Sequence, residues 1–511
     1  MSRSSLRRTV AGGATLAAGA ALLAGVAAPT AGAQPAATSA AAAVPAGLVP
    51  VRTLTSLLGT HAWYAQTFHG LPVVDGYYAV HTLTSGTSVA DGRRSVPATL
   101  VTTPALTAQT ALGRAASART AAASAAAGKA VAAGHPKNAP LAPAVAGDSR
   151  ATLAVVGGPD AAIVWQVITT GDDGESRTLV DARTGAVREV RSLSKNAEGP
   201  AATPAGTDAT GTASVFDPNP VVALRDESLT DGKDANSAVP NRAYVTVALP
   251  RLLPGSTTLS GRYAKVTKAA GGLAKSAGHD FTYRRADDRF EQANAYYGID
   301  KAQAYIRSLG FTDVNNEPQR LHVDTYKGDN SFYSPTQDTI TYGTGGVDDA
   351  EDLEVVWHEY GHAIQDAQVP GYGSSEEAGA TGEGFGDYWA VSMAQPTSRG
   401  FDDPCVMDWD STSYTTTVPH CLRRTDTGKT VADMTGEVHD DGEIWSNALW
   451  DVHQALGRDE ANRIVLEAQF SYTPDTSFAA AARVTVATAR SLYGDPAART
   501  VRQAFAARGI L

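Results

Sequence analysis

Two histidines and a glutamate stand at a spacing that could hold and use a metal ion. His358 and His362 are four residues apart, and Glu359 directly follows the first histidine. On an α-helix, residues four apart lie on the same face, so both imidazoles could reach one ion. The order H-E-x-x-H pairs two zinc ligands with a carboxylate that can act as a base on water. The spacing therefore predicts a hydrolytic zinc site, provided that a third ligand exists.

A second pair of acidic residues can complete this site. Glu383 and Asp387 are also four residues apart, which places two carboxylates on one helix face. Glu383 can be the third zinc ligand and leave a fourth position for water. Asp387 can accept the free ring N–H of a ligating histidine, for which His358 is the candidate, and so fix its orientation. A solvated acidic face is the alternative, but neighbouring aromatic residues indicate burial (Phe385, Tyr388 and Trp389).

The helix expected around the histidines has the features of a stable buried element. Asp348, Asp349 and Glu351 stand at its start, where the helix dipole favours negative charge. Apolar residues recur along it at helical intervals (Leu353, Val356, Trp357, Tyr360 and Ile364). Strand-like segments precede this helix, and mainly helical segments follow it. This order predicts an α+β fold with a strand-rich lobe at 212–346, a helical lobe at 347–511 and a cleft between them.

Composition narrows the class of protein. The chain has 511 residues, of which 43% are hydrophobic, so it can form several domains with apolar cores. Its formal net charge of -11 argues against nucleic acid or an anionic membrane surface as the main partner. No apolar run beyond the N-terminus is long enough to cross a bilayer as a helix. We expect a soluble protein once the N-terminus has been processed.

The first 33 residues have the pattern of an export signal. Arg3, Arg7 and Arg8 precede an apolar stretch, and the Ala-Gly-Ala sequence at 31–33 offers a cleavage site between small residues. The Arg7-Arg8 pair is compatible with the twin-arginine route, although the residues after it match that signal loosely. An ordinary Sec signal is the alternative. By either route we expect a secreted protein.

Export makes the cysteine content informative. Cys405 and Cys421 are the two cysteines of the chain, and in an oxidising compartment we expect them to form a disulfide. The short loop between them makes this bond worth about 3 kcal/mol in the chain-entropy model. Two unrelated buried thiols are the alternative. A cysteine-based zinc site is not expected, because the C-x-x-C spacing is absent.

The motifs resemble those of the gluzincin metallopeptidases, specifically the thermolysin and fungalysin families. The resemblance rests on H-E-x-x-H at 358–362, followed by G-E-x-x-x-D at 382–387. Residues 438–445 are similar to the segment that carries the transition-state histidine in fungalysin-like enzymes. The resemblance implies one catalytic Zn²⁺, with His439 donating a hydrogen bond to the oxyanion of the tetrahedral intermediate.

The role of His439 has an alternative and an open detail. An imidazole at the start of a helix, beside the cleft, is placed to stabilise negative charge, but it could also simply cap that helix. Asp433 and Glu437 both lie near it in the sequence. The sequence does not decide which of the two carboxylates is its partner.

The same resemblance suggests residues on the substrate side. In these families an edge strand follows the position of Asn330 and Ser331 and binds an extended peptide by strand addition. Arg423 or Arg424 could bind a substrate carbonyl, and Tyr372 could be a second oxyanion donor. A turn asparagine, and a surface charge for one of the adjacent arginines, are the alternatives.

The first half of the chain resembles the prosegment of the same families. Residues 67–74 resemble the fungalysin/thermolysin propeptide (FTP) signature, and the strands up to residue 185 look like the PepSY-type unit that often follows it. The resemblance implies a prosegment, ending near residue 200, that chaperones and inhibits the protease until it is cleaved. Within it, the Asp75-Gly76 pair predicts a turn between two strands.

These features divide the chain into consecutive segments. We expect a signal peptide at 1–33, a connector at 34–51, an FTP-like unit at 52–106, a helix with a PepSY-like unit at 107–193, a linker with the processing site at 194–211, and the two catalytic lobes at 212–346 and 347–511.

Together the motifs predict a secreted zinc endopeptidase made as a zymogen, in which Glu359 takes a proton from the attacking water. Its partners would be peptide substrates and its own prosegment, and Ca²⁺ is a possible further ligand that no pattern assigns. One alternative is a zinc aminopeptidase, which would need a device that holds the substrate's free amine. Another is a catalytically silent binding or inhibitory protein, against which the intact Glu359 argues.

Overall fold

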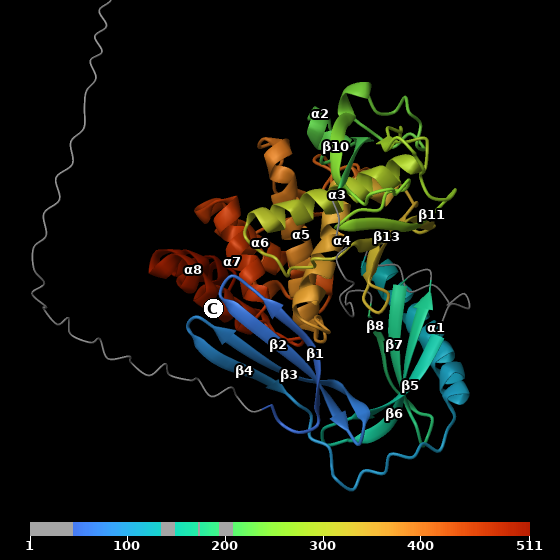
Figure 1. Ribbon diagram of the computed structural model, residues 1–511, viewed down its shortest axis with the longest axis vertical. Helices are drawn as coiled ribbons and strands as arrows, with labels where there is room; N and C mark the ends of the chain where they lie inside the picture. Colours follow the sequence, from blue (N-terminus) through green and yellow to red (C-terminus); the bar gives the residue numbers. More distant parts are fainter. Residues whose placement is uncertain (1–43, 134–148, 172–173, 194–207) are drawn as a thin grey trace, which may run out of the picture. The chain divides into compact units, whose positions relative to one another are not determined.

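The computed structural model describes residues 44–133, 149–171, 174–193 and 208–511 (Figure 1). The expected signal peptide, and residues 194–207 of the expected linker, lie outside the described residues. Pro45–Leu511 form one structural unit. Its fold is mixed α+β, as the sequence predicts, with a strand-rich N-terminal region and a helical C-terminal region.

An eight-stranded sheet forms the N-terminal part of this unit. Its strand order is β1-β2-β3-β5-β6-β7-β8, and β4 pairs with β3. The strands are β1 (Leu48–Thr55), β2 (Gly59–Phe68), β3 (Leu71–Leu83), β4 (Gly86–Gly92), β5 (Ser149–Val156), β6 (Ala162–Gly171), β7 (Gly174–Asp181) and β8 (Val187–Ser192). The alanine-rich helix α1 (Ala108–Ala133) packs on β5 to β8. β1 thus begins inside the segment that the sequence predicts to be a connector.

The Asp75-Gly76 pair does not form the turn that the sequence predicts. Both residues lie inside β3, and the chain reverses instead at His69-Gly70, where φ is 50° and 82°. Asp75 has a φ of 54°, and the register between β2 and β3 shifts beside it. The pair therefore forms a bulge. The bulge presents the Asp75 carboxylate to Arg177, whose two Nη atoms lie 2.6 and 2.8 Å from it.

A second sheet forms the strand-rich part that precedes the histidine helix. Its strand order is β11-β13-β15-β14, with the antiparallel strand β14 at one edge. The strands are β11 (Ala264–Ala269), β13 (Gln319–Tyr326), β14 (Phe332–Ser334) and β15 (Thr339–Gly343), and α3 (Arg289–Ser308) packs on β11 and β13. A smaller sheet precedes it, made of β9 (Ala209–Val215), β10 (Val245–Leu252) and β12 (Asp280–Phe281).

Helices make up most of the C-terminal region. They are α4 (Leu353–Gln368), α5 (Glu376–Ser398), α6 (Val438–Leu456), α7 (Arg458–Gln469) and α8 (Phe478–Ala507). α5 packs on both α4 and α6 (Figure 1). The acidic residues expected at the start of α4 lie instead in a 3-10 turn, Asp349–Glu351, that precedes it. Among the described residues, no helix is both long and apolar enough to span a membrane.

Cys405 and Cys421 form the expected disulfide, with their Cα atoms 5.2 Å apart. It lies beside a two-stranded sheet of β16 (Cys405–Val406) and β17 (Arg423–Arg424). Val406 pairs with Arg423 in this sheet. The cross-linked loop therefore fixes the backbone from which Arg423 extends.

Candidate metal centre

Helix α4 carries His358, Glu359 and His362, and all of its residues are buried. Asp352 caps its N-terminus by accepting a hydrogen bond from the Glu354 backbone N–H at 2.9 Å. The two imidazole rings have their centroids 4.9 Å apart, as expected for residues one helical turn apart. The helix therefore holds both rings in fixed positions beside each other.

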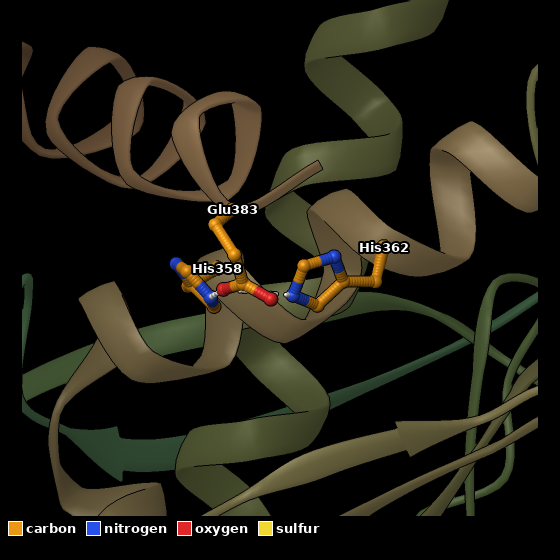
Figure 2. Close-up of side chains that lie close together, drawn as sticks. All are labelled: His358, His362 and Glu383. Atoms are coloured by element: carbon orange, nitrogen blue, oxygen red, sulfur yellow. Dashed lines mark hydrogen bonds and ion pairs between the residues drawn. The ribbon is translucent and has the colours of Figure 1, made fainter. Parts of the chain in front are cut away.

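Helix α5 brings a carboxylate to the two histidines. The Oε2 atom of Glu383 lies 3.2 Å from Nε2 of His358 and 3.7 Å from Nε2 of His362. One ligand atom from each of the three residues lies within 4.8 Å of the others (Figure 2). Two imidazoles and one carboxylate, all buried, form the donor set that hydrolytic zinc sites use. The residues present therefore fit a zinc ion.

Glycines let the helices approach closely at this centre. A Cβ on Gly386 of α5 would lie 2.7 Å from Nδ1 of His358, a distance that carbon atoms do not tolerate. A Cβ on Gly384 would collide with the backbone oxygen of Gly442 in α6. Any side chain at these positions would push α5 away from its neighbours. The glycines therefore set the distance between the ligand-bearing helices.

Asp387 connects the centre to a buried arginine. Its Oδ1 lies 2.9 Å from Nδ1 of His358, and Arg423 donates to both of its oxygens at 2.7 Å. Burial alone would raise the pKa of Asp387, but the Arg423 guanidinium and the bond to His358 outweigh burial and hold this pKa well below its usual range. Asp387 is therefore an anion that fixes the ring of His358. This contact gives Arg423 a partner other than a substrate carbonyl.

The same contacts change the titration of His358. Burial opposes the charged imidazolium, yet the hydrogen bonds to Asp387 and Glu383 outweigh it and raise the pKa of His358 to about 9. A histidine ligates a metal in its neutral form, so metal binding must displace this proton.

His439 lies in the first turn of α6 and reaches the centre. Its Nε2 is 3.4 Å from Oε2 of Glu383, and its Nδ1 is 2.7 Å from Oε1 of Glu437. The side chain is 38% exposed, so a ligand can approach it. Glu437 also caps α6 by accepting from the backbone N–H groups of His439 and Asp440. The helix start therefore orients both residues.

The choice between the two carboxylates near His439 follows from these caps. Asp433 accepts from the backbone N–H and hydroxyl of Thr430, both at 2.9 Å, and caps a different, short helix. Glu437 contacts the imidazole. Burial acts to raise the pKa of Glu437. The hydrogen bond and the electrostatic interaction with His439 outweigh burial and lower this pKa to about 2. Glu437 is thus the ionised partner of His439, which the sequence could not decide.

Three of the residues expected on the substrate side bind groups outside the centre. Asn330 is exposed just before β14, and Ser331 donates to Oδ2 of Asp349 at 2.6 Å. The hydroxyl of Tyr372 is buried and lies 2.5 Å from Oγ1 of Thr381. Arg424 donates to Asp426 and Asp402. The centre thus gathers His358, His362, Glu383, Asp387, Arg423 and His439. Tyr372 and Arg424 bind other groups.

The comparison with known families agrees with this geometry. The sequence model of the fungalysin metallopeptidases matches residues 279–510, a range that includes every residue of the centre. Residues 279–510 thus resemble the fungalysin metallopeptidases. The fungalysin/thermolysin propeptide motif matches residues 46–90. Both matches confirm the resemblance found in the sequence, and the fungalysin family implies zinc as the metal.

One solved structure similar to this chain is the precursor of protealysin, a metalloproteinase from Serratia proteamaculans. The two share 18% sequence identity, with a TM-score of 0.37, over 58% of this chain and 99% of that chain. No curated protein matches this chain.

Proposed function

We propose that this fungalysin-type protein is a secreted zinc endopeptidase made as a zymogen. One observation carries this function: ligand atoms of His358, His362 and Glu383 converge within 4.8 Å, and Glu359 stands directly beside the first of them. These three residues would hold the ion. Zn²⁺ bound there would polarise the scissile carbonyl and lower the pKa of a water molecule to about 7.

Glu359 would move the proton. It follows His358 on α4 and is only 7% exposed, so its carboxylate faces the interior beside the centre rather than bulk solvent. It would accept a proton from the attacking water and then deliver that proton to the leaving amine. Asp387 would keep the His358 ring oriented throughout, because Arg423 keeps this carboxylate ionised.

His439 would stabilise the oxyanion that forms when water attacks the carbonyl. Glu437 lies 2.7 Å from Nδ1 and holds the imidazole ring in place. Nε2 lies 3.4 Å from Glu383, which places the donor beside the ligand set. A donor held in position before the reaction stabilises developing charge without reorganisation.

The substrate would bind as an extended strand. β14 lies at the edge of its four-stranded sheet, so its outer backbone groups can pair with a peptide. Asn330 and Ser331 directly precede this strand. In the zymogen, Glu175 of β7 accepts a hydrogen bond from the Thr336 backbone N–H at 3.0 Å, just beyond β14. This contact supports a prosegment that limits access to the same edge.

The chain would be expressed at full length, left to process itself and then purified. Three measurements would test this function: zinc content, cleavage of an internally quenched peptide, and the new N-terminus. We expect about one zinc per chain and a cut within 194–211. Glu359→Gln should keep the zinc and lose cleavage by several orders of magnitude. Glu460→Gln, an exposed residue on α7, is the control. Parental activity in Glu359→Gln would contradict the assignment of the base.

Blocked and free-amine peptides separate the two kinds of peptidase. An endopeptidase cleaves a peptide whose amino terminus is acetylated, whereas an aminopeptidase requires the free amine. We expect the acetylated peptide to be cleaved at an internal bond. Cleavage restricted to the free-amine peptide would favour the aminopeptidase.

A further inference from the structure

Two buried carboxylates in the strand-rich region before α4 lack the partners that buried charges need. Glu291 of α3 is 0% exposed and Asp324 of β13 is 7% exposed. Among the residues that the structure describes, no other residue donates a hydrogen bond to any of their carboxylate oxygens. Buried charges are usually paired or bound to a metal, because an isolated charge in the interior is very costly. Both side chains are therefore suited to a positively charged ligand.

The backbone of β13 directs Asp324 out of the regular strand pattern. Its φ is 54°, in the left-handed region that aspartate tolerates better than most residues. The register between β13 and β15 shifts between His322 and Tyr326, so Asp324 lies in a bulge, which re-aims a side chain. The bulge at Asp75 presents a carboxylate to an arginine, whereas no described arginine or lysine donates to Asp324.

Helix α3 brings Glu291 to the same region, because α3 packs on β13 and on the 3-10 turn Asp349–Glu351. Asn294 follows Glu291 by three positions, so the two side chains share one face of α3. The Asn294 side chain donates to two backbone oxygens of the turn, at 2.8 and 3.1 Å. The face that carries Glu291 is thus held against the turn, within electrostatic reach of Asp324.

Asp348 adds a third negative charge at the solvent side of this region. It occupies the N-cap position of the 3-10 turn, but its side chain makes no capping hydrogen bond. Its charge repels both Glu291 and Asp324, and unlike them it is partly exposed. Three carboxylates from three segments thus meet, and solvent reaches one of them.

Arg285 is a guanidinium beside this region, and it is committed to other carboxylates. Its Nε and Nη2 atoms each donate to Glu351 at 2.8 Å. Nη2 also donates to Asp231 at 2.5 Å. This guanidinium charge already faces two carboxylates, so it leaves the charges of Glu291 and Asp324 uncompensated.

We propose that Glu291 and Asp324 bind a Ca²⁺ ion, with Asp348 beside it at the solvent side. Ca²⁺ takes about six to eight oxygen ligands in flexible geometry, and a carboxylate can bind it through both oxygens. Two such carboxylates would supply about half of this shell, and water entering past Asp348 would complete it. None of these residues would hold the zinc ion, so this is a second metal site, with a structural role.

The ion would link three segments that are distant in the sequence. Glu291 lies on α3, Asp324 on β13, and Asp348 just before the turn that leads into α4. Because α4 carries His358 and His362, calcium would steady the segment at which the histidine helix begins. Its binding would stabilise the folded state by mass action, because the unfolded chain does not hold these carboxylates together.

Calcium binding can be measured on a full-length chain with Glu359→Gln, which lacks the proposed base and should not digest itself. Isothermal titration of the calcium-free protein with CaCl₂ should give a Kd of about 1 mM or lower, as in extracellular calcium modules. The melting temperature should rise by about 2 °C or more in about 10 mM CaCl₂. MgCl₂ should raise it less, because Mg²⁺ requires a regular octahedral shell. Neither measurement depends on peptide hydrolysis.

Glu291→Gln and Asp324→Asn keep the shape of each side chain and remove its charge, and asparagine also tolerates the left-handed φ. Each should weaken calcium binding about tenfold or more and abolish the rise in melting temperature. Without calcium, neither should melt below the parent, because each relieves repulsion between buried charges. The response is the difference between two buffers, so a uniform change in stability does not affect it. Glu460→Gln, exposed on α7, is the matched control and should keep the parental response.

Two results would overturn the calcium site. One is a parent whose melting temperature does not change with CaCl₂, which would mean that protons rather than a metal neutralise these carboxylates. The other is a calcium response that survives in both Glu291→Gln and Asp324→Asn. Calcium would then bind elsewhere, and Asp410→Asn would test the cluster of Asp329, Asp349 and Asp410, whose ligand atoms lie within 4.8 Å of one another.

Discussion

Arg423 and Asp387 form a buried ion pair directly behind His358. Both carboxylate oxygens of Asp387 accept hydrogen bonds from Arg423 at 2.7 Å, and one of them also lies 2.9 Å from Nδ1 of His358. A guanidinium suits this geometry because its N–H groups form a planar fork that matches a carboxylate. We therefore expect Arg423 to position His358, one of the three residues that would hold the metal, through Asp387.

Arg423→Gln should therefore weaken zinc binding and lower kcat, both by about 10- to 100-fold, because the orienting carboxylate loses its cation. KM should change little. The measurements are steady-state kinetics and competition with a zinc chelator. Arg424→Gln, at the neighbouring position, should stay close to the parent. A raised KM with parental zinc affinity in Arg423→Gln would instead indicate that Arg423 binds the substrate carbonyl.

Glu437→Gln should lower kcat and leave KM nearly unchanged, because Glu437 holds the His439 ring by a bond of 2.7 Å at Nδ1. The loss should be smaller than the about 10²- to 10³-fold loss that follows removal of an oxyanion donor itself. Asp433→Asn is the matched control, since that carboxylate caps another helix. An equal loss in both variants would point to a general effect on this loop.

Gly386→Ala should impair the metal centre more than its single methyl group suggests. The new Cβ would lie 2.7 Å from Nδ1 of His358, so either the ring or helix α5 must move. We expect zinc affinity to fall by about tenfold or more. Zinc titration with a metal indicator would measure it. Gly113→Ala, a helical position with no neighbouring atom within 4 Å of its Cβ, should leave zinc affinity unchanged.

Acid should loosen the docked prosegment through two buried histidines. The Nδ1 atoms of His61 and His81 lie 2.8 Å apart, and the ring of His61 stacks on Phe470. Burial lowers the pKa of His61 from 6.5 to about 3, with a further effect from His81, and burial lowers the pKa of His81 to about 4. Groups with lowered pKa values stabilise the docked state above pH 6.5, and this contribution is lost as the pH falls toward 4.

The contribution of Glu467 depends on pH in the opposite direction. This residue of α7 accepts hydrogen bonds from the Ser56 hydroxyl and from the Leu57 and Leu58 N–H groups of the prosegment. Burial raises its pKa from 4.5 to about 7 despite its hydrogen bonds, so its contribution is complete below pH 4.5 and is lost as the pH rises to 7. Comparing the parent with histidine variants between pH 7 and pH 4 separates the contribution of the histidines from that of Glu467. After a cut in the linker at 194–211, the N-terminal fragment should dissociate from the rest of the chain faster in acid, and His81→Gln should flatten this dependence. His69→Gln, at the exposed turn, should retain it.

Local spacing predicts those parts of the centre that lie on one helix. His358 and His362, like Glu383 and Asp387, are four residues apart, and the helical repeat alone places each pair on one face. Burial of α5 follows from its aromatic residues. The distance between α4 and α5, however, depends on the close approach of the His358 ring to Gly386, which no single-helix pattern contains.

Contacts between distant segments are the part that the sequence does not reveal. Arg423 pairs with Asp387 across 36 positions, and nothing near Arg423 distinguishes it from Arg424. Glu437 is the partner of His439 because it caps α6, a detail of backbone geometry that sequence proximity cannot separate from Asp433. The Asp75-Gly76 pair has turn chemistry, but its carboxylate binds Arg177 and the strand continues through it as a bulge.

The contact of Arg52, in β1 of the prosegment, with the end of α4 affects how long the mature enzyme would stay active. Arg52 lies in the part that the proposed zymogen loses, yet it binds the terminal carbonyl groups of the helix that carries both histidines. A mature enzyme that unfolds would have to form this helix end again without that guanidinium. Its working lifetime would then be set by how slowly it unfolds, and not by how readily it folds again.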